Sequence, residues 1–198
     1  MRRPAIALLL LLHAGAAGQE ANALDSLTRR MLDSAPFLLA YHYSISADDF
    51  QQATSGTLYV AAAAVFRLDM FDKVYGSDGS SLYLHDRNTR QTVIDSLRME
   101  ELLIWLRLLA GDPPEDVVVG RLTREGRGQR LAISHSGDLW AGDLLLDDDS
   151  GAIRQVRIRE ANGWRHSIDL QPRRPWLSRT REQWVRLEDL PGKRLDLR

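Results

Sequence analysis

The stretch that decides the fold class is VFRLDMFDKVYGSDGSSLYL, residues 65–84. From 65 to 70, large apolar residues alternate with Arg67 and Asp69, and this period of two is typical of a β-strand with two different faces. The pair Asp78-Gly79 then separates two strand-like runs, and such a pair favours the tight turn of a hairpin. The stretch therefore predicts antiparallel strands joined by short turns.

The same alternation continues along most of the chain. Phe37 to Ser46 is a run with one larger, more apolar face, and later runs are separated by turns that contain glycine. We expect a polar hairpin turn from Asp48 to Ser55 and a bend at Ala61–Ala64. In sum, the pattern predicts a mainly β protein of about eleven strands, arranged as an antiparallel barrel or half-barrel.

Two segments depart from this pattern and have helical spacing instead. The first is amphipathic, begins near residue 25 and ends at Pro36, because proline disrupts a helix. The second, Arg98 to Ala110, has apolar residues around most of its circumference and is followed by Pro113-Pro114, which prevents its continuation. A helix of that kind has to be buried against a wide surface.

Residues 1–16 have the composition of a secretory signal peptide. Arg2 and Arg3 precede an apolar run from Ala5 to Leu12, which is too short to span a bilayer, and Ala14-Gly15-Ala16 is typical of a cleavage site. The alternative is a short buried N-terminal helix. We expect residues 17–198 to form a single domain, whose formal charge changes from −1 to −3 when the two arginines are removed.

The sequence contains no cysteine. This excludes disulfides, thiol chemistry and a lipid anchor on an N-terminal cysteine. No long basic run is present either, which argues against nucleic acid as a partner. We expect a soluble protein of the periplasm, stabilised by its core and its sheet alone.

No motif for catalysis, metal binding or cofactor binding is found. The histidines of the mature chain lie on different expected strands and lack the spacing of common metal sites: His42, His85, His135 and His166. The acidic run 147–151 matches a calcium loop only at its start. We therefore expect no enzyme activity, no metal and no cofactor, although distant residues of a β-barrel can still assemble a catalytic site.

The order of motifs from Gly56 to Ile94 resembles the LolA-like family of periplasmic outer-membrane lipoprotein carriers. A strand that opens with glycine (Gly56–Val60) is followed by a Phe-Arg strand (Val65–Leu68), and then by a Ser-Asp-Gly hairpin whose return strand ends in aspartate (Ser77–Asp86). The two expected helices lie where the family has its first helix and its lid helices. Near the end, Trp184 is similar to the family's closing aromatic residue.

Two departures place the chain at the edge of this family. Ala61–Ala64 replaces a basic-proline pair, and Trp184 replaces a phenylalanine. The resemblance implies a half-open antiparallel β-barrel with an N-terminal helix and a central apolar lid helix, whose apolar concave side receives the acyl chains of lipoproteins.

The resemblance also implies partners. Such a monomeric carrier takes acylated lipoproteins from an inner-membrane lipoprotein-releasing transporter and delivers them to an outer-membrane lipoprotein receptor, without a cofactor. The alternatives are a periplasmic lipid- or lipoprotein-binding sensor of the same fold without transport activity, and an enzyme that acts on a lipid.

Candidate site residues follow from the same resemblance. Arg67 matches an arginine that ties the lid closed and releases it when cargo enters, a role suited to the five donors of a guanidinium. The alternative is a surface arginine paired with Asp69 or Asp72, and alternation places Arg67 opposite its apolar neighbours. The central helix is either a movable lid or a fixed plug. The expected residues of the acyl-binding cavity or lid are Phe66, Leu68, Met70, Leu82, Leu84, Leu102, Leu103, Trp105 and Leu106.

Overall fold

The computed structural model of this chain describes residues 24, 26–29, 33, 35–98, 102–149, 151–173 and 190–198. These residues form one twelve-stranded sheet with a short helix, α2 (Ile104–Leu109), on one face. The strands are β1 (Phe37–Ala47), β2 (Phe50–Ala62), β3 (Val65–Asp69), β4 (Lys73–Asp78), β5 (Ser81–Asp86), β6 (Gln91–Ser96), β7 (Val117–Glu125), β8 (Gly128–His135), β9 (Trp140–Asp147), β10 (Ile153–Glu160), β11 (Arg165–Arg173) and β12 (Lys193–Asp196).

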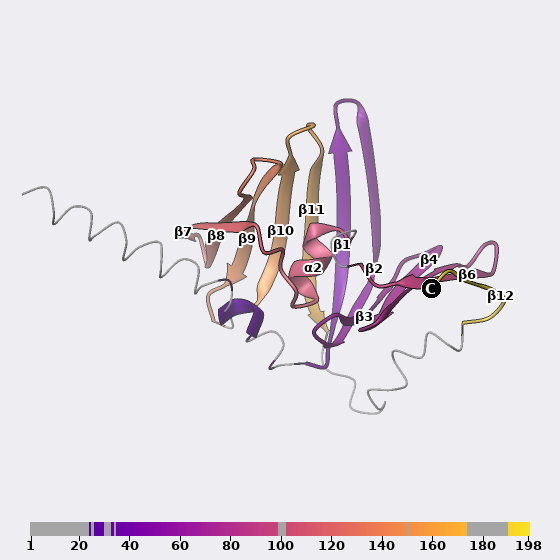
Figure 1. The fold of residues 1–198 in the computed structure, drawn as a ribbon. Coiled ribbons are helices and arrows are strands. Elements are labelled where there is room, and N and C mark those ends of the chain that lie inside the picture. Colours follow the sequence, from indigo (N-terminus) through magenta and orange to yellow (C-terminus); the bar gives the residue numbers. More distant parts are fainter. Residues whose placement is uncertain are drawn as a thin grey trace, which may run out of the picture.

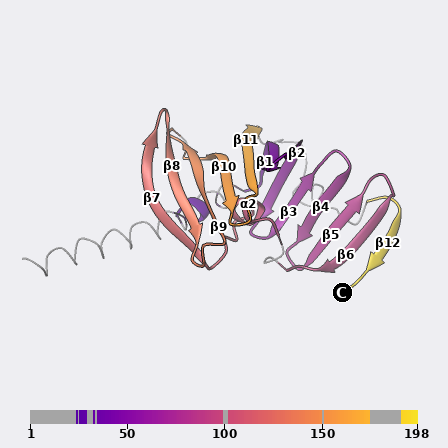
Figure 2. The same ribbon diagram turned by 90° about the horizontal axis from the view of Figure 1, so that it is seen from above.

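The sheet is a single open surface whose strand order is β12-β6-β5-β4-β3-β2-β1-β11-β10-β9-β8-β7. Figure 2 shows this row from above, with β7 and β12 at its two ends. All neighbours are antiparallel except β12, which runs parallel to β6. The pairing of β1 with β11 joins the first meander to the second, so the two halves of the chain form one continuous sheet. This arrangement is consistent with a half-open β-barrel.

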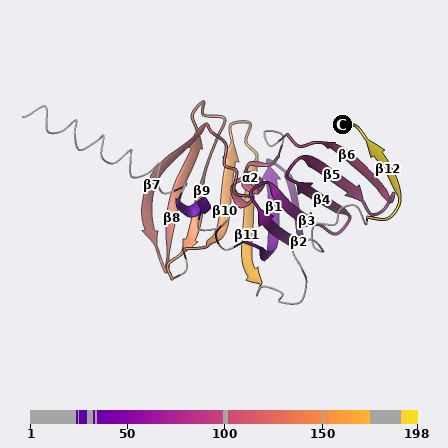
Figure 3. The same cartoon turned by 60° about the horizontal axis from the view of Figure 1, so that its bottom comes forward.

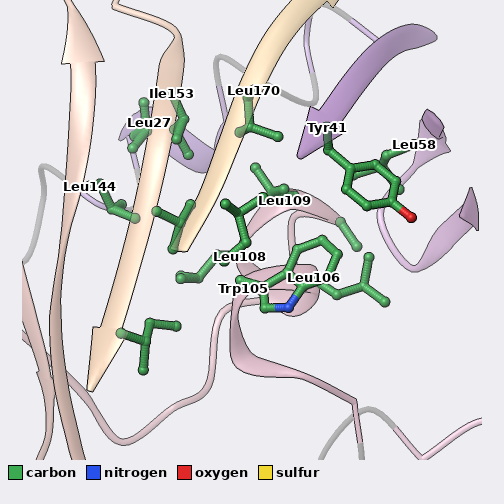
Figure 4. Packing of buried hydrophobic residues seen from close by; sticks show 14 of the residues in the cluster. Leu27, Tyr41, Leu58, Trp105, Leu106, Leu108, Leu109, Leu144, Ile153 and Leu170 are labelled. Carbon is green, nitrogen blue, oxygen red and sulfur yellow. The ribbon is translucent and has the colours of Figure 1, made fainter. Parts of the chain in front are cut away.

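Helix α2 packs against one face of the sheet, which we call the inner face. Figures 1 and 3 place it beside β1 and β11, near the centre of the strand row. Figure 4 shows its leucines and Trp105 meeting side chains that come from strands on both sides of that centre. The opposite face of the sheet is called the outer face.

Alternation along each strand sorts side chains between these two faces. Phe66 and Leu68 of β3 belong to the large core cluster with α2, and Leu58 of β2 pairs directly with Leu68. On the outer face, a small second cluster consists of Val74, Tyr83 and Ile94, and Leu190 packs against it. The remaining core residues of the inner face come mainly from the second meander, and include Leu131, Ile133, Leu144, Val156, Ile158, Ile168 and Leu170.

The first hairpin differs from the one the sequence predicts. A turn at Asp48-Asp49 connects β1 to β2, and the pairing already resumes with Phe50 opposite Ala47. Asp48 adopts a positive φ of 44°, which lets the chain reverse within two residues. The polar residues expected to form a long turn are therefore strand residues, because backbone pairing with β1 outweighs their low apolar content.

The bend expected at Ala61–Ala64 is a tight turn. Strand β2 continues to Ala62, and Ala64 has a φ of 57° in the turn that leads to β3. The register between β2 and β3 shifts between Val60 and Ala62. This irregularity marks the place where the sheet bends away from a regular ladder.

The central helix is shorter than expected. Among the described residues of the expected range, Ile104–Leu109 are helical, and Arg98, Leu102 and Leu103 lie outside the helix. At the N-terminal side, residues 24, 26–29 and 33 are helical, as predicted, and the side chains of Leu24 and Leu27 are buried in the main core. The expected signal peptide and Trp184 lie outside the described residues.

Candidate functional site

The candidate site is the apolar surface between α2 and the inner face. Four of the six helix residues, Trp105, Leu106, Leu108 and Leu109, are 0–3% exposed. They are buried because the helix is apolar around most of its circumference and lies across strands that present apolar side chains at every second position. Figure 4 shows the helix residues between Leu144 and Leu170 on one side and Tyr41 and Leu58 on the other.

Few polar contacts hold α2 in place. The backbone N–H of Ala64 donates to the carbonyl oxygen of Ala110 at 3.2 Å, which joins the end of the helix to the turn between β2 and β3. Arg107 bonds to Asp112 just beyond the helix, and Leu103 at the N-cap makes no side-chain capping bond. A helix this short is unstable alone, so packing against the sheet keeps it formed.

Aromatic rings line the site beneath the start of α2. The ring centre of Trp105 lies 5.6 Å from that of Tyr43 and 6.0 Å from that of Tyr41. The hydroxyl of Tyr43 lies 2.9 Å from Nδ1 of His166, and Nε2 of His166 lies 3.0 Å from a carboxylate oxygen of Glu160. This chain of hydrogen bonds satisfies polar groups that are otherwise costly to bury.

Burial changes the acidity of these tyrosines. It raises the pKa of Tyr43 to about 12, and the negative charge of Glu160 adds to the effect. The pKa of Tyr41 is raised further, by burial first and by Asp69 second. Both phenols therefore stay neutral at ordinary pH. The indole N–H of Trp105 is buried and has no hydrogen-bond partner among the described residues.

A small pocket opens beside the start of α2. Its volume is about 150 Å³, and its lining residues are Leu102, Leu103, Ile104, Trp105, Ile158, Glu160 and His166. Ligand sites usually have volumes of about 300–1,000 Å³. This pocket is smaller than that range, so a large apolar ligand does not fit in it in this conformation.

Most of the predicted cavity residues gather at this site. Phe66, Leu68, Trp105 and Leu106 lie together in the main core. A second group is half-buried and packs against that core: Met70, Leu82 and Leu102.

Two predicted cavity residues lie at its margin. Leu84 shares the inner face with Leu82 by register but stands outside the core cluster, and Leu103 is 47% exposed at the helix start.

Arg67 lies on the outer face, opposite α2. Its Nε donates to Oδ1 of Asp69 at 3.1 Å, and Arg87 bonds to the same carboxylate oxygen at 3.3 Å. This is the surface pairing with Asp69 that the sequence left open as an alternative. A residue that locks the lid by bonding to it has to lie on the inner face, so the placement of Arg67 does not fit the role implied by the resemblance.

The sequence did not identify Tyr43, Glu160 or His166 as site residues. Tyr43 and His166 are 123 positions apart and meet only because β1 pairs with β11. The three residues come from three different strands, so no local signal in the sequence groups them. Tyr41 and Tyr43 are two positions apart on one strand, and this spacing predicted that their side chains share a face.

Within the described ranges, no group of three or more His, Cys, Asp or Glu side chains is arranged to hold a metal ion. Nor does that part of the chain contain a helix long and apolar enough to span a membrane.

No family model matches this sequence, and no curated protein matches it. Among solved structures, the chain is similar to an uncharacterized conserved protein from Thermus thermophilus at 12% identity, with a TM-score of 0.56, over 86% of this chain and 97% of that chain.

Two further similar structures have lower TM-scores. They are a LolA superfamily protein from Nitrosomonas europaea (8% identity, TM-score 0.45, 77% of this chain and 91% of that chain) and a putative outer membrane lipoprotein-sorting protein domain from Vibrio parahaemolyticus (8% identity, TM-score 0.42, 82% of this chain and 95% of that chain). At identities this low the likeness concerns the fold alone.

Proposed function

We propose that this protein is a periplasmic carrier that binds the acyl chains of lipoproteins on its inner face and transfers lipoproteins from the inner to the outer membrane. The observation that carries the proposal is α2, a short apolar helix that covers the apolar face of an open sheet and is held mainly by packing. The order of motifs from Gly56 to Ile94, which resembles the lipoprotein carriers, supports the same function.

The free energies involved are compatible with ligand-driven opening. Exposing the four buried side chains of α2 costs about 1.5–3 kcal/mol for each, or about 6–12 kcal/mol together. Burying an acyl chain gains about 0.8 kcal/mol per methylene, so a chain of about fifteen methylenes gains about 12 kcal/mol. One acyl chain therefore offsets the cost of displacing α2 even at its upper end, and the gain from a second chain exceeds that cost.

The proposed partners follow from this exchange. An acylated lipoprotein needs a donor that supplies it and an acceptor that removes it, because its acyl chains are too apolar to cross water alone. We infer that an inner-membrane lipoprotein-releasing transporter is the donor and an outer-membrane lipoprotein receptor is the acceptor. The chain needs no cofactor and no catalytic step for this role.

The second candidate function is a lipid or lipoprotein sensor without transport activity. The observation that favours it is the hydrogen-bonded set of Tyr43, His166 and Glu160 at the edge of the α2 pocket. Polar groups at the end of an apolar site give specificity for a ligand's head. A sensor binds acylated ligand tightly and fails to pass it to a receptor.

Native mass spectrometry tests the proposal. The protein is purified from the periplasm with and without a co-expressed acylated lipoprotein, and a lipoprotein whose acylated cysteine is replaced serves as the control. The proposal predicts a stoichiometric complex with the acylated form alone. A bare monomer in every preparation contradicts it.

A transfer assay separates carrier from sensor. Donor membranes, the purified protein and receptor-bearing acceptor membranes are combined, and the acylated lipoprotein is followed between the two membranes. Transfer that depends on the protein is expected of a carrier. Tight binding without transfer supports the sensor instead.

A further inference from the structure

Three arginines meet on the outer face of β10 and β11, away from the proposed acyl site. Arg157 and Arg159 occupy alternate positions of β10, and Arg165 of β11 pairs directly with Arg159. All three are exposed. The cluster is not evident from the sequence. Arg157 and Arg159 alternate with apolar residues, Arg165 lies on the next strand, and the net charge of the chain is −1.

Two nearby carboxylates, Asp143 and Glu160, bond to residues outside the cluster. Asp143 lies on the neighbouring strand, but its carboxylate accepts a 2.8 Å hydrogen bond from Arg130. Glu160 follows Arg159 in sequence, yet its side chain bonds to His166 on the inner face. No ion pair joins any of the three arginines to another residue in the part of the chain that the structure describes.

The cluster borders a depression of about 590 Å³. Its hydroxyl groups come from Ser44 and Ser46 of β1 and from Ser167 of β11. Ser167 pairs with Arg157 on one side and with Ser44 on the other, so cationic and neutral donors lie next to each other across the sheet. The full lining is Ser44, Ser46, Arg130, Ala141, Gly142, Asp143, Arg157, Ile158, Arg159, Arg165, His166 and Ser167.

We propose that this depression is an anion-binding site for a phosphate group, formed by Arg157, Arg159 and Arg165 with serine hydroxyls beside them. The guanidinium fork matches the oxygens of a phosphate and never loses its charge. Like charges held this close repel one another, and a bound anion relieves that repulsion. The three arginines lie on the face opposite α2, and the proposal does not depend on the acyl-binding function.

The first experiment titrates inorganic phosphate and measures binding by calorimetry at low salt. We expect binding by the native protein, and an affinity about tenfold weaker for each of the substitutions Arg157→Gln and Arg159→Gln, since each removes a charge-assisted hydrogen bond. Arg124→Gln is the matched control, because Arg124 is an exposed strand arginine outside the depression with a side chain 82% exposed. This control leaves phosphate affinity unchanged.

A second arm identifies the source of the phosphate. Flotation with phosphatidylglycerol vesicles, compared with phosphatidylcholine vesicles, reports whether the site takes a lipid headgroup at a bilayer surface. Binding of phosphate together with phosphatidylglycerol vesicles assigns a headgroup site, and binding of phosphate alone assigns a small phosphorylated ligand. Equal phosphate binding by the native protein and the Arg157→Gln/Arg159→Gln variant, or no binding by either, overturns the proposal.

Discussion

The inner and outer faces of the same strands differ sharply, and β10 shows the difference within three residues. Ile158 is 4% exposed and lies in the main core, whereas Arg157 and Arg159 on either side of it are exposed on the outer face. The inner face gains its stability by excluding water beneath α2. The outer face stays hydrated and charged, so one sheet can offer an apolar site and an anionic-ligand site without mixing them.

The largest expected effect comes from a substitution on the inner face. Phe66→Ala removes a side chain with 0% exposure and leaves a cavity in the core. We expect the free energy of unfolding to fall by about 3–5 kcal/mol, measured by urea denaturation. Arg67→Ala, one position away on the outer face, is the matched control and changes stability by less than about 1 kcal/mol. Equal losses of free energy of unfolding in the two variants contradict the assignment of Phe66 to the buried face and Arg67 to the opposite one.

A substitution in α2 links stability to ligand binding. Leu109→Ala lowers the free energy of unfolding by about 2–5 kcal/mol, because Leu109 has 0% exposure. It also weakens the packing that holds α2 closed, so the open state becomes more populated and acylated lipopeptide binds more tightly. Fluorescence titration with a labelled lipopeptide measures this gain.

Leu139→Ala is the control for this prediction, since Leu139 is 60% exposed and lies outside the pocket beside α2. Stability and affinity both change little in this variant. If Leu109→Ala weakens lipopeptide binding while the protein stays folded, α2 contributes to the bound state and is not displaced by the ligand.

The acidity of Tyr43 reports the burial of the inner face. Its pKa is raised from 10.0 to about 12, so the stability that its neutral form contributes is fully present below pH 10 and is lost as the pH rises towards 12. The difference in phenolate absorbance between the native protein and Tyr43→Phe isolates this group. A transition near 12 is expected, and one near 10 shows that the ring is exposed to water.

The smallest expected effect lies on the outer face. The double substitution Arg157→Gln and Arg159→Gln changes the free energy of unfolding by no more than about 0.5 kcal/mol, because exposed side chains away from special features contribute little to stability. Thermal denaturation at low and high salt measures it. A large loss of stability means that the two arginines stabilise the fold, and it contradicts the expectation that only the inner face does so.

Sequence periodicity predicted the strands and their two faces well. The alternation of Phe66, Arg67 and Leu68 separated apolar from polar positions correctly, and Asp78-Gly79 marked a real hairpin between β4 and β5. Alternation alone cannot say which face a distant helix covers. For that reason the resemblance assigned Arg67 to the lid, while the structure places it on the other side.

The remaining differences arise from long-range pairing. The polar residues after Asp48 form part of β2 because β1 offers them a complete ladder of backbone partners. The set formed by Tyr43, Glu160 and His166 depends on pairing between the two halves of the chain. Helix α2 ends before Pro113-Pro114, as predicted, but its start was placed too early, since no capping residue marks it.

Photolabelling identifies the segments of the protein that contact a bound acyl chain. A synthetic lipopeptide with a photoreactive group in its acyl chain is bound to the protein, irradiated, and the labelled peptides are identified by mass spectrometry. We expect saturable labelling of inner-face segments, around Phe66–Leu68 and around α2, which an excess of unlabelled lipopeptide prevents. Labelling confined to outer-face segments, or labelling that no competitor reduces, contradicts an acyl-binding site beneath α2.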